Sequence, residues 1–438
     1  MNKIVASVSL VALGAASIQA QSTSPGQNAS ITSPPAKWWN VAATVRGFYD
    51  DNADTSPNGT PKIATWGYEL NPSIGISLGN QQTSFSASYA FHYLYYEKPL
   101  STVVGSHGEH AATTKDDMDH TFTAALDHAF NQSYSVHVAN SFVIGQQPDT
   151  LRAGNALTVF QRVPGDNIIN MGTVAVDGQL TRELGFEVGY NNNFFQYDAE
   201  QLAGILNRIE NYAHVDLKWI LSHETVGVLG YQFGDIDYTG NGLLFDPAKP
   251  TGLAPITINN TVSHTVYAGV DHTFLPNLTG SVRAGASYYD YINDTGASDF
   301  GPYASANLSY TYAPESSVSV GFQEGRISSS LVSTNSIIHD TETSVLYGSV
   351  VHRIIPNLFG SVQGTFQNSM YHGGGPGVNG ESDRYYAVGV QLEYRFTPNF
   401  SAQAGYNYDR LDSSLSQTAV GPRDYDRNKF YIGATARY

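Results

Sequence analysis

Cysteine is absent from this 438-residue chain, so neither disulfide bonds nor thiolate metal sites can stabilise its fold. Charged residues make up only 14% of the composition. Basic residues are fewer than acidic ones, with 22 Lys and Arg against 38 Asp and Glu. This acidic balance disfavours a nucleic-acid partner, because binding to phosphates requires a basic surface. Beyond the first 20 residues no apolar run reaches about 18 residues, which excludes membrane-spanning helices.

The first 20 residues have the three parts of a secretory signal peptide. Residues 1–3 (MNK) are a short positive start, residues 4–18 are an apolar run, and the small residue Ala20 offers a cleavage site. We expect cleavage after Ala20. The mature chain would lose Lys3 and would then carry 21 basic residues against 38 acidic ones, a net charge near −17. The alternative, an N-terminal membrane anchor, is disfavoured because the apolar run is too short to span a bilayer comfortably.

What the chain does contain is Tyr, Phe and Gly in long alternating patterns. The segment FSASYAFHY (Phe85 to Tyr93) puts aromatic residues and Ala on one face and mostly Ser and His on the other, and YAVGVQLEYRF (Tyr386 to Phe396) alternates in the same way. Period-2 patterns of this length indicate β-strands with one apolar and one polar face. They exceed the usual strand of about 5–6 residues and reach the about 9–11 residues that an oblique bilayer crossing requires.

There are 18 alternating segments, and the connections between them are alternately short and long. Three of the tight connections contain Pro-Asn, at 276–277, 356–357 and 398–399, where Pro presets a turn and Asn tolerates its geometry. Short turns alternating with long loops are typical of outer-membrane barrels. We therefore predict an all-β fold: a transmembrane antiparallel up-and-down β-barrel of about 18 strands over residues 41–438, with 16 or 20 strands as the alternative counts. Both termini would be periplasmic, and residues 21–40 would be a flexible lead-in.

The polar face of the predicted strands indicates a function. Its residues are mainly Ser, Thr, Gln, Asn and Gly with scattered charge, and these could not pack a dry core without leaving costly unpaired polar groups. A barrel of 16–18 strands is wide enough to enclose water instead. The sequence therefore predicts a channel in the bacterial outer membrane for passive diffusion of small hydrophilic solutes, with no cofactor. Its partners would be those solutes, outer-membrane lipid and lipopolysaccharide; an assembly of several identical copies stays open.

The chain ends on an alternating segment, KFYIGATARY, in which Phe430, Ile432 and the terminal Tyr438 share one face. This ending resembles the C-terminal assembly signal that the outer-membrane insertion machinery reads. We therefore expect Phe430 and Tyr438 to contribute to recognition by the barrel-assembly machinery.

Three short motifs add a resemblance to a known family. They are YDDN (Tyr49 to Asn52) in the first strand, GYNYDR (Gly405 to Arg410) in the penultimate strand, and YDRN (Tyr425 to Asn428) at the start of the last strand. With the Pro-Asn turns, they resemble the putative β-barrel porin type 2 family of Gram-negative outer-membrane proteins. The resemblance implies an outer-membrane barrel and supplies no catalytic residues. Some relatives are associated with exopolysaccharide-export loci, so it leaves open an export or surface-structural role.

Selectivity is expected in the third external loop, residues 146–167. In general porins the corresponding loop folds into the channel and narrows it. Here Asp149, Arg152, Arg162 and Asp166 would place opposed charges across such a constriction and sort solutes by charge and size. The alternative is that the loop packs outside over the rim. Inward-facing Arg283, Glu393, Arg395 and Arg437 are the candidates for charged residues of the lumen wall.

Other chemistry is disfavoured by the sequence. HGEH (His107 to His110) has the spacing of metal ligands but lies in a Gly- and Ser-rich loop without further ligands, and DNAD (Asp51 to Asp54) lacks the remainder of a calcium loop. Histidines are scattered and no GxSxG motif occurs, so we expect neither a metal site nor an enzyme. A soluble, secreted all-β adhesin is the remaining alternative to a membrane barrel.

Overall fold

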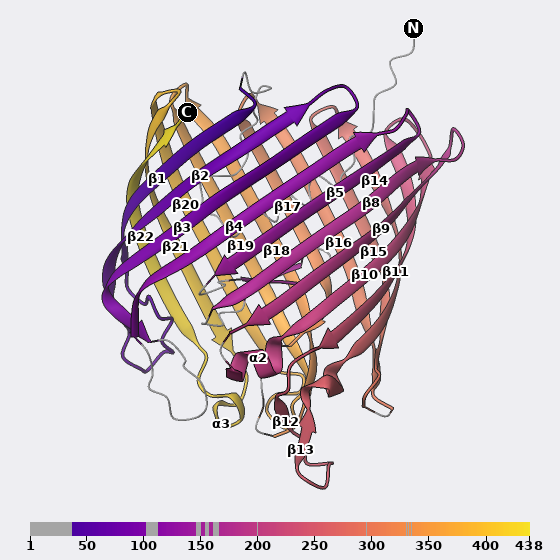
Figure 1. Cartoon of the computed structure of the whole chain (residues 1–438), viewed down its shortest axis with the longest axis vertical. Coiled ribbons are helices and arrows are strands. Elements are labelled where there is room, and N and C mark those ends of the chain that lie inside the picture. Colours follow the sequence, from indigo (N-terminus) through magenta and orange to yellow (C-terminus); the bar gives the residue numbers. More distant parts are fainter. Residues whose placement is uncertain are drawn as a thin grey trace.

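The computed structural model describes residues 37–101, 113–145, 150–153, 157–160, 166–198, 200–294, 296–329, 331, 333 and 335–438. Eighteen antiparallel strands form one sheet that closes on itself (Figure 1), because β1 (Trp39–Asp50) pairs both with β2 (Thr65–Gly79) and with β22 (Tyr425–Arg437). The predicted fold class and the strand count of 18 are confirmed. No described helix is long and apolar enough to cross a membrane.

Each of the remaining barrel strands pairs with its neighbours along the chain. They are β3 (Thr83–Ser101), β4 (Thr113–Ala129), β5 (Tyr134–Gly145), β8 (Asn167–Gln179), β9 (Leu184–Tyr197), β10 (Arg208–Ile220), β11 (Thr225–Tyr238), β14 (Thr261–Leu275), β15 (Leu278–Tyr291), β16 (Ser298–Ala313), β17 (Ser316–Ser328), β18 (Ile338–Ile355), β19 (Leu358–Gly373), β20 (Ser382–Thr397) and β21 (Phe400–Ser413).

The two ends of the barrel differ in the length of their connections. The C-terminus and the start of β1 lie at the end with the tight turns, at the top of Figure 1. The opposite end, called here the mouth, carries α2 (Glu200–Leu206), α3 (Gln417–Val420) and the hairpin of β12 (Leu243–Phe245) and β13 (Leu253–Pro255), which is followed by the 3₁₀ turn η1 (Ile256–Asn259). A second small hairpin, of β6 (Thr150–Ala153) and β7 (Leu157–Phe160), lies between β5 and β8.

The Pro-Asn pairs lie at tight turns, as predicted, and the structure explains why Asn follows Pro. In each turn the Asn carbonyl accepts a hydrogen bond from a backbone N–H on the next strand along: Asn277 from Thr311 (2.9 Å), Asn357 from Arg395 (2.8 Å) and Asn399 from Arg437 (2.8 Å). The side chains of Asn277 and Asn399 also donate to the carbonyls of the same two partners, both at 2.8 Å. The repeated dipeptide therefore joins three strands rather than two.

Alternation separates the two faces of the barrel wall. The outward face carries large apolar side chains that are exposed in the isolated chain, among them Val45, Trp66, Leu229, Val282 and Ile432. The predicted assembly-signal residues Phe430 and Tyr438 belong to this face. Apolar groups exposed on every barrel strand would be unfavourable in water. They form the belt that a barrel presents to lipid.

Aromatic rings on the inward face lie against glycines of the adjacent strand. A Cβ atom built on Gly230 would lie 2.2 Å from the ring of Tyr267, and one on Gly321 would lie 2.2 Å from the ring of Tyr347. Gly405 and Tyr431 repeat the arrangement. Any larger residue at these glycines would displace the ring, so glycine here provides space for flat packing along the wall.

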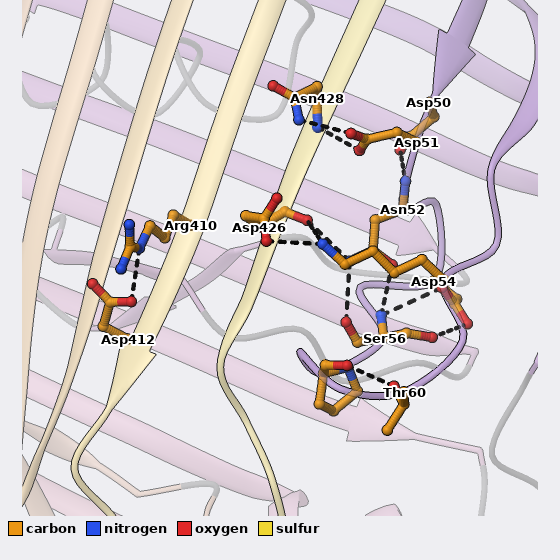
Figure 2. A network of polar contacts seen from close by, with 12 residues as sticks. Asp50, Asp51, Asn52, Asp54, Ser56, Thr60, Arg410, Asp412, Asp426 and Asn428 are labelled. Atoms are coloured by element: carbon orange, nitrogen blue, oxygen red, sulfur yellow. Dashed lines mark hydrogen bonds and ion pairs between the residues drawn. The ribbon is translucent and has the colours of Figure 1, made fainter.

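The motifs YDDN and YDRN meet where the barrel closes, as Figure 2 shows. The Asp51 carboxylate accepts two hydrogen bonds from Asn428, from its backbone N–H and from its side chain, both at 2.7 Å. Asn52 is fully buried; its side chain donates to the carbonyls of Asp426 (3.0 Å) and Ser56 (3.1 Å) and accepts from the Ser56 N–H (2.9 Å). The two motifs therefore tie the β1–β2 loop to the last strand.

The third motif joins the same network. In GYNYDR, Tyr406 donates to the Asn428 side chain at 2.7 Å, and Asp409 pairs with Arg427 at 3.1 Å. The acids of DNAD are also engaged, since Asp54 accepts from the Ser56 hydroxyl at 2.7 Å. These Asp residues shape a turn, and no cluster of three metal-binding side chains occurs in the described part of the chain.

Replacing Asn52 by Ala should destabilise the closed barrel. The substitution removes two donated bonds and one accepted bond inside a buried site, which should cost about 2–3 kcal/mol of the free energy of unfolding. The measurement is the temperature at which the purified barrel loses its compact mobility in gels without prior boiling. Thr60→Ala is the control, because exposed Thr60 bonds only to Pro57 within its own loop. Equal midpoints for both variants would contradict this account of closure.

Candidate functional site

The space inside the barrel is lined by polar side chains that are buried against one another. They include acids, amides, hydroxyls and arginines on most of the barrel strands. Typical members are Thr44, Glu69, Asn193, Gln232, Ser287, Thr343, Gln391 and Ser401. Because these groups are paired with each other or face the interior space, the lumen is a polar environment enclosed by an apolar outer belt.

A first group of charges, called here the Arg46 cluster, consists of Arg46, Glu69, His92, Asp119 and Gln403. Arg46 donates to Glu69 at 3.0 Å and to Gln403 at 3.1 Å, which links β1 to β2 and β21. His92 on β3 lies 3.4 Å from both Glu69 and Asp119, which extends the cluster to β4. The Arg46 and Glu69 side chains are 5% and 4% exposed, so this pair is held out of bulk water.

A second group, the Lys218 cluster, lies on β8, β9 and β10. The Lys218 ammonium is 2.7 Å from Asp177 and 2.5 Å from Glu187, and Glu187 also lies 3.2 Å from His214. Asp216, two residues before Lys218, accepts a hydrogen bond from the Tyr267 hydroxyl at 2.5 Å. Carboxylates outnumber the lysine here, so this part of the wall is acidic.

The four residues predicted for the lumen wall all have the inward position on their strands. Arg283 on β15 pairs with Asp271 at 2.7 Å. Glu393 on β20 pairs with Arg437 at 3.0 Å and with Arg395 at 3.5 Å.

The pairs at the turn end continue as a chain of charges. Arg395 also reaches Glu315, at 3.3 Å, and Arg353 pairs with the same carboxylate at 2.9 Å. We call these five residues the Glu393 chain: Arg353, Glu315, Arg395, Glu393 and Arg437. With three arginines and two acids it is basic. Alternation can place these residues inward, but it cannot identify Glu315, which lies in the turn between β16 and β17, as their partner.

Only some of the residues predicted for the constriction, in the loop of residues 146–167, lie in the described part of the chain. Asp149 and Arg162 lie outside the described residues, Arg152 lies on β6, and Asp166 is exposed at the mouth just before β8. Cα atoms of β7 lie within 8 Å of Cα atoms of β18. Since β5 and β18 are half the ring apart, the β6–β7 hairpin extends from its own wall to the opposite one.

The long loops at the mouth contain packed apolar residues that sequence reasoning missed. Leu206 of α2 is buried with Ile169, Phe195 and Tyr197. A second cluster joins the β12–β13 hairpin and η1 to the barrel: Leu244, Ala254, Ile256 and Ile258 pack with Ile236, Tyr238 and Ile337. The apolar stretches LAGIL (residues 202–206) and LAPITI (residues 253–258) were the available signal. These loops are therefore packed against the end of the barrel at the mouth.

A closed barrel with a lipid-facing belt and a polar, charged interior defines the class of porin-like outer-membrane β-barrels. The family comparison narrows this class. Residues 256–347 and 341–438 match the family model described as "Putative beta-barrel porin 2". This match covers residues 256–438 and agrees with the family resemblance that the sequence motifs indicate. His107 to His110, the weak metal motif, lies outside the described residues.

Solved outer-membrane proteins are similar to most of this chain at low identity. OccAB4 of Acinetobacter baumannii is 13% identical, with 92% of this chain and 99% of that chain covered and a TM-score of 0.41. OpdK of Pseudomonas aeruginosa, solved with vanillate, is 12% identical, with 91% and 99% covered and a TM-score of 0.44. Comparison with curated proteins gives no match.

Replacing Arg46 by Met should destabilise the barrel far more than an equivalent change outside the lumen. The buried Glu69 carboxylate would lose its closest cation, and breaking a buried pair in this way typically costs about 3–5 kcal/mol. Arg410→Met is the matched control, because the exposed Arg410–Asp412 pair at 2.7 Å should contribute less than about 1 kcal/mol. Denaturant midpoints of the three proteins in detergent provide the measurement, and similar losses in both variants would contradict the assignment.

Proposed function

We propose that this protein is a porin-like channel through which small hydrophilic solutes diffuse across the outer membrane. The observation that carries the proposal is the closed 18-stranded barrel whose interior is polar and charged while its exterior is apolar. Solutes would cross by diffusion, without a cofactor and without a catalytic step. The family match over residues 256–438 supports the same function.

Orientation follows from the asymmetry of the two ends. In outer-membrane barrels the short turns face the periplasm and the long loops face outside. Both ends of the barrel domain would then be periplasmic, after removal of residues 1–20 as a signal peptide. Phe430 and Tyr438, on the lipid-facing side of β22, would serve as the signal for the barrel-assembly machinery.

Selection among solutes would depend on charge and on the loop that crosses the barrel. A solute would meet the acidic Lys218 cluster on the β8–β10 wall and the basic Glu393 chain at the turn end. The β6–β7 hairpin, which approaches β18, would narrow the path between opposite walls. Asp149, Arg152, Arg162 and Asp166 remain our candidates for the charges that line this constriction.

The alternatives differ in how well they account for the wall. A soluble adhesin would not require large apolar side chains on the outside of every strand. An exopolysaccharide-export or surface-structural role is compatible with the barrel, but none of the contacts described above favours it over diffusion of small solutes.

Planar-bilayer recording of the purified protein tests the proposal directly. A water-filled lumen should give stepwise openings whose conductance scales with salt concentration. A folded barrel, verified by its heat-dependent gel mobility, that inserts without any openings would overturn the channel function in favour of a structural role.

Replacing residues 150–160 by a short Gly-Ser linker should increase the single-channel conductance. This change removes the β6–β7 hairpin and widens the path if the hairpin narrows it. The control shortens the tip of the β12–β13 hairpin at residues 247–251, which protrudes beyond the mouth in Figure 1, and should leave conductance unchanged. An unchanged conductance in the first variant would place the hairpin away from the conducting path.

A further inference from the structure

The ladder between β16 and β17 is incomplete. β16 begins at Ser298 and β17 ends at Ser328, but their pairing stops at Ala304 and Glu324. Each strand remains paired on its other side, β16 with β15 from Ser298 and β17 with β18 to Ser328. The last six residues of β16 toward the mouth therefore face β17 without a ladder.

A proline lies in the stretch where the ladder is missing. Pro302 lies in the unpaired stretch of β16 and has no N–H to donate, so it interrupts hydrogen bonding to a neighbouring strand. A proline in a central strand is unusual because it leaves the wall locally weaker, and lipid cannot replace the missing hydrogen bonds.

Arg326 on β17 occupies the resulting gap. Its guanidinium donates to the main-chain carbonyl of Phe300 on β16 at 3.0 Å and pairs with Asp299 at 2.8 Å. On the β18 side it pairs with Asp340 at 3.2 Å and lies 3.7 Å from Glu342. The Arg326 side chain is only 3% exposed. One side chain thus replaces the missing ladder between β16 and β17, and we call it the Arg326 latch.

On β17 and β18, beside this gap, the polarity of both faces of the wall is reversed. On the inward face, Ile327 and Val345 are buried together against Tyr347, whereas most of the lumen is polar. On the outward face, Glu324 and Glu342 occupy positions that continue the apolar row of Val320 on β17 and Leu346 on β18. An apolar patch inside and acids outside, joined by a gap, would lower the barrier for a molecule that has both kinds of surface.

We propose that the stretch between β16 and β17 is a lateral opening through which an amphiphile, a molecule with a polar head and an alkyl chain, exchanges between the lumen and the lipid phase. The alkyl chain packs against Ile327, Val345 and Tyr347, and the polar head passes the charged groups of the gap. The Arg326 latch keeps this opening closed. The route is additional to axial diffusion of hydrophilic solutes and requires only that the barrel be inserted in a membrane.

Hydrogen exchange in lipid nanodiscs tests the latch. Arg326→Met should raise the exchange rate of the amides in residues 298–303 and 325–328 about tenfold or more. The substitution removes the charged hydrogen bonds of Arg326, and no β16–β17 ladder holds these residues in their place. Arg283→Met is the matched control: it removes a similar inward Arg–Asp pair, but the β14–β15 ladder beside Arg283 is continuous. The proposal would be overturned if the amides of residues 298–303 and 325–328 exchanged as slowly as those of β14 and β15 and if Arg326→Met left their exchange rate unchanged.

Photolabelling tests the passage itself. The probe is dodecyl maltoside with a photoreactive alkyl chain, supplied from the lipid side. It should label inward-facing Ile327 and Val345, and Arg326→Met should increase this labelling relative to outward-facing Val320. The chain has no cysteine, so Tyr303→Cys with Ser328→Cys can be joined by a bis-maleimide to lock the gap, and locking should abolish the inward labelling.

The two proposed routes fail separately in these experiments. If the barrel conducts along its axis but the probe labels only the outward face, with or without the Arg326 latch, the lateral route is overturned. The proposed channel function would not be affected by that result. Inward labelling at Ile327 and Val345 in a barrel without conductance would support the lateral route and overturn axial diffusion. Should Arg326→Met fail to fold, the locked and unlocked cysteine pair still decides the lateral route.

Discussion

Closure of the sheet is the constraint on which the rest of this structure depends. A strand edge in lipid would leave its backbone N–H and C=O groups without partners, and each such group costs several kcal/mol in an apolar medium. Pairing of β1 with β22 removes both edges at once. Two of the sequence motifs meet at this junction: Asp51 and Asn52, just after the first strand, bind Asn428 and Asp426 from the last. Their sequence signature therefore reflects how the barrel is closed, and solute recognition must be sought elsewhere.

Once the sheet is closed, its two faces experience different solvents, and the charges must be arranged accordingly. Every charged residue predicted for the lumen wall is inward and has an oppositely charged partner: Arg283 pairs with Asp271, and Glu393 lies between Arg395 and Arg437. A paired charge costs less to bury and still presents a local field to a passing solute. The net acidity of the chain consequently says little about the lumen, where basic and acidic groups are distributed over different strands.

The sequence predicted what depends on local periodicity and missed what depends on long-range contact. Alternation located all 18 strands and the inward position of Arg283 or Glu393, because parity along a strand is a local property. It could not place Glu315 beside Arg395, which lies 80 residues further along the chain. Leu206 and Ile256 lie between the predicted strands, and isolated apolar stretches between Gly and Pro give no periodic signal until their partners on the barrel are known. Pro302 was visible in the sequence, but its consequence for the β16–β17 ladder was not.

The incomplete ladder shows how closure and polarity interact. Where the ladders between neighbouring strands are continuous, the apolar and polar faces of the wall alternate. Between β16 and β17 the backbone of Phe300 is satisfied by a guanidinium instead, and a cation in the wall requires carboxylates on both sides of it, which Asp299 and Asp340 provide. Glu342, on the outward row, follows from the same demand. The missing N–H at Pro302 thus lies beside a charged cluster inside the wall, and that cluster includes the acids on both sides of Arg326. A ladder of hydrogen bonds can open only cooperatively, whereas a latch made by one side chain can open locally.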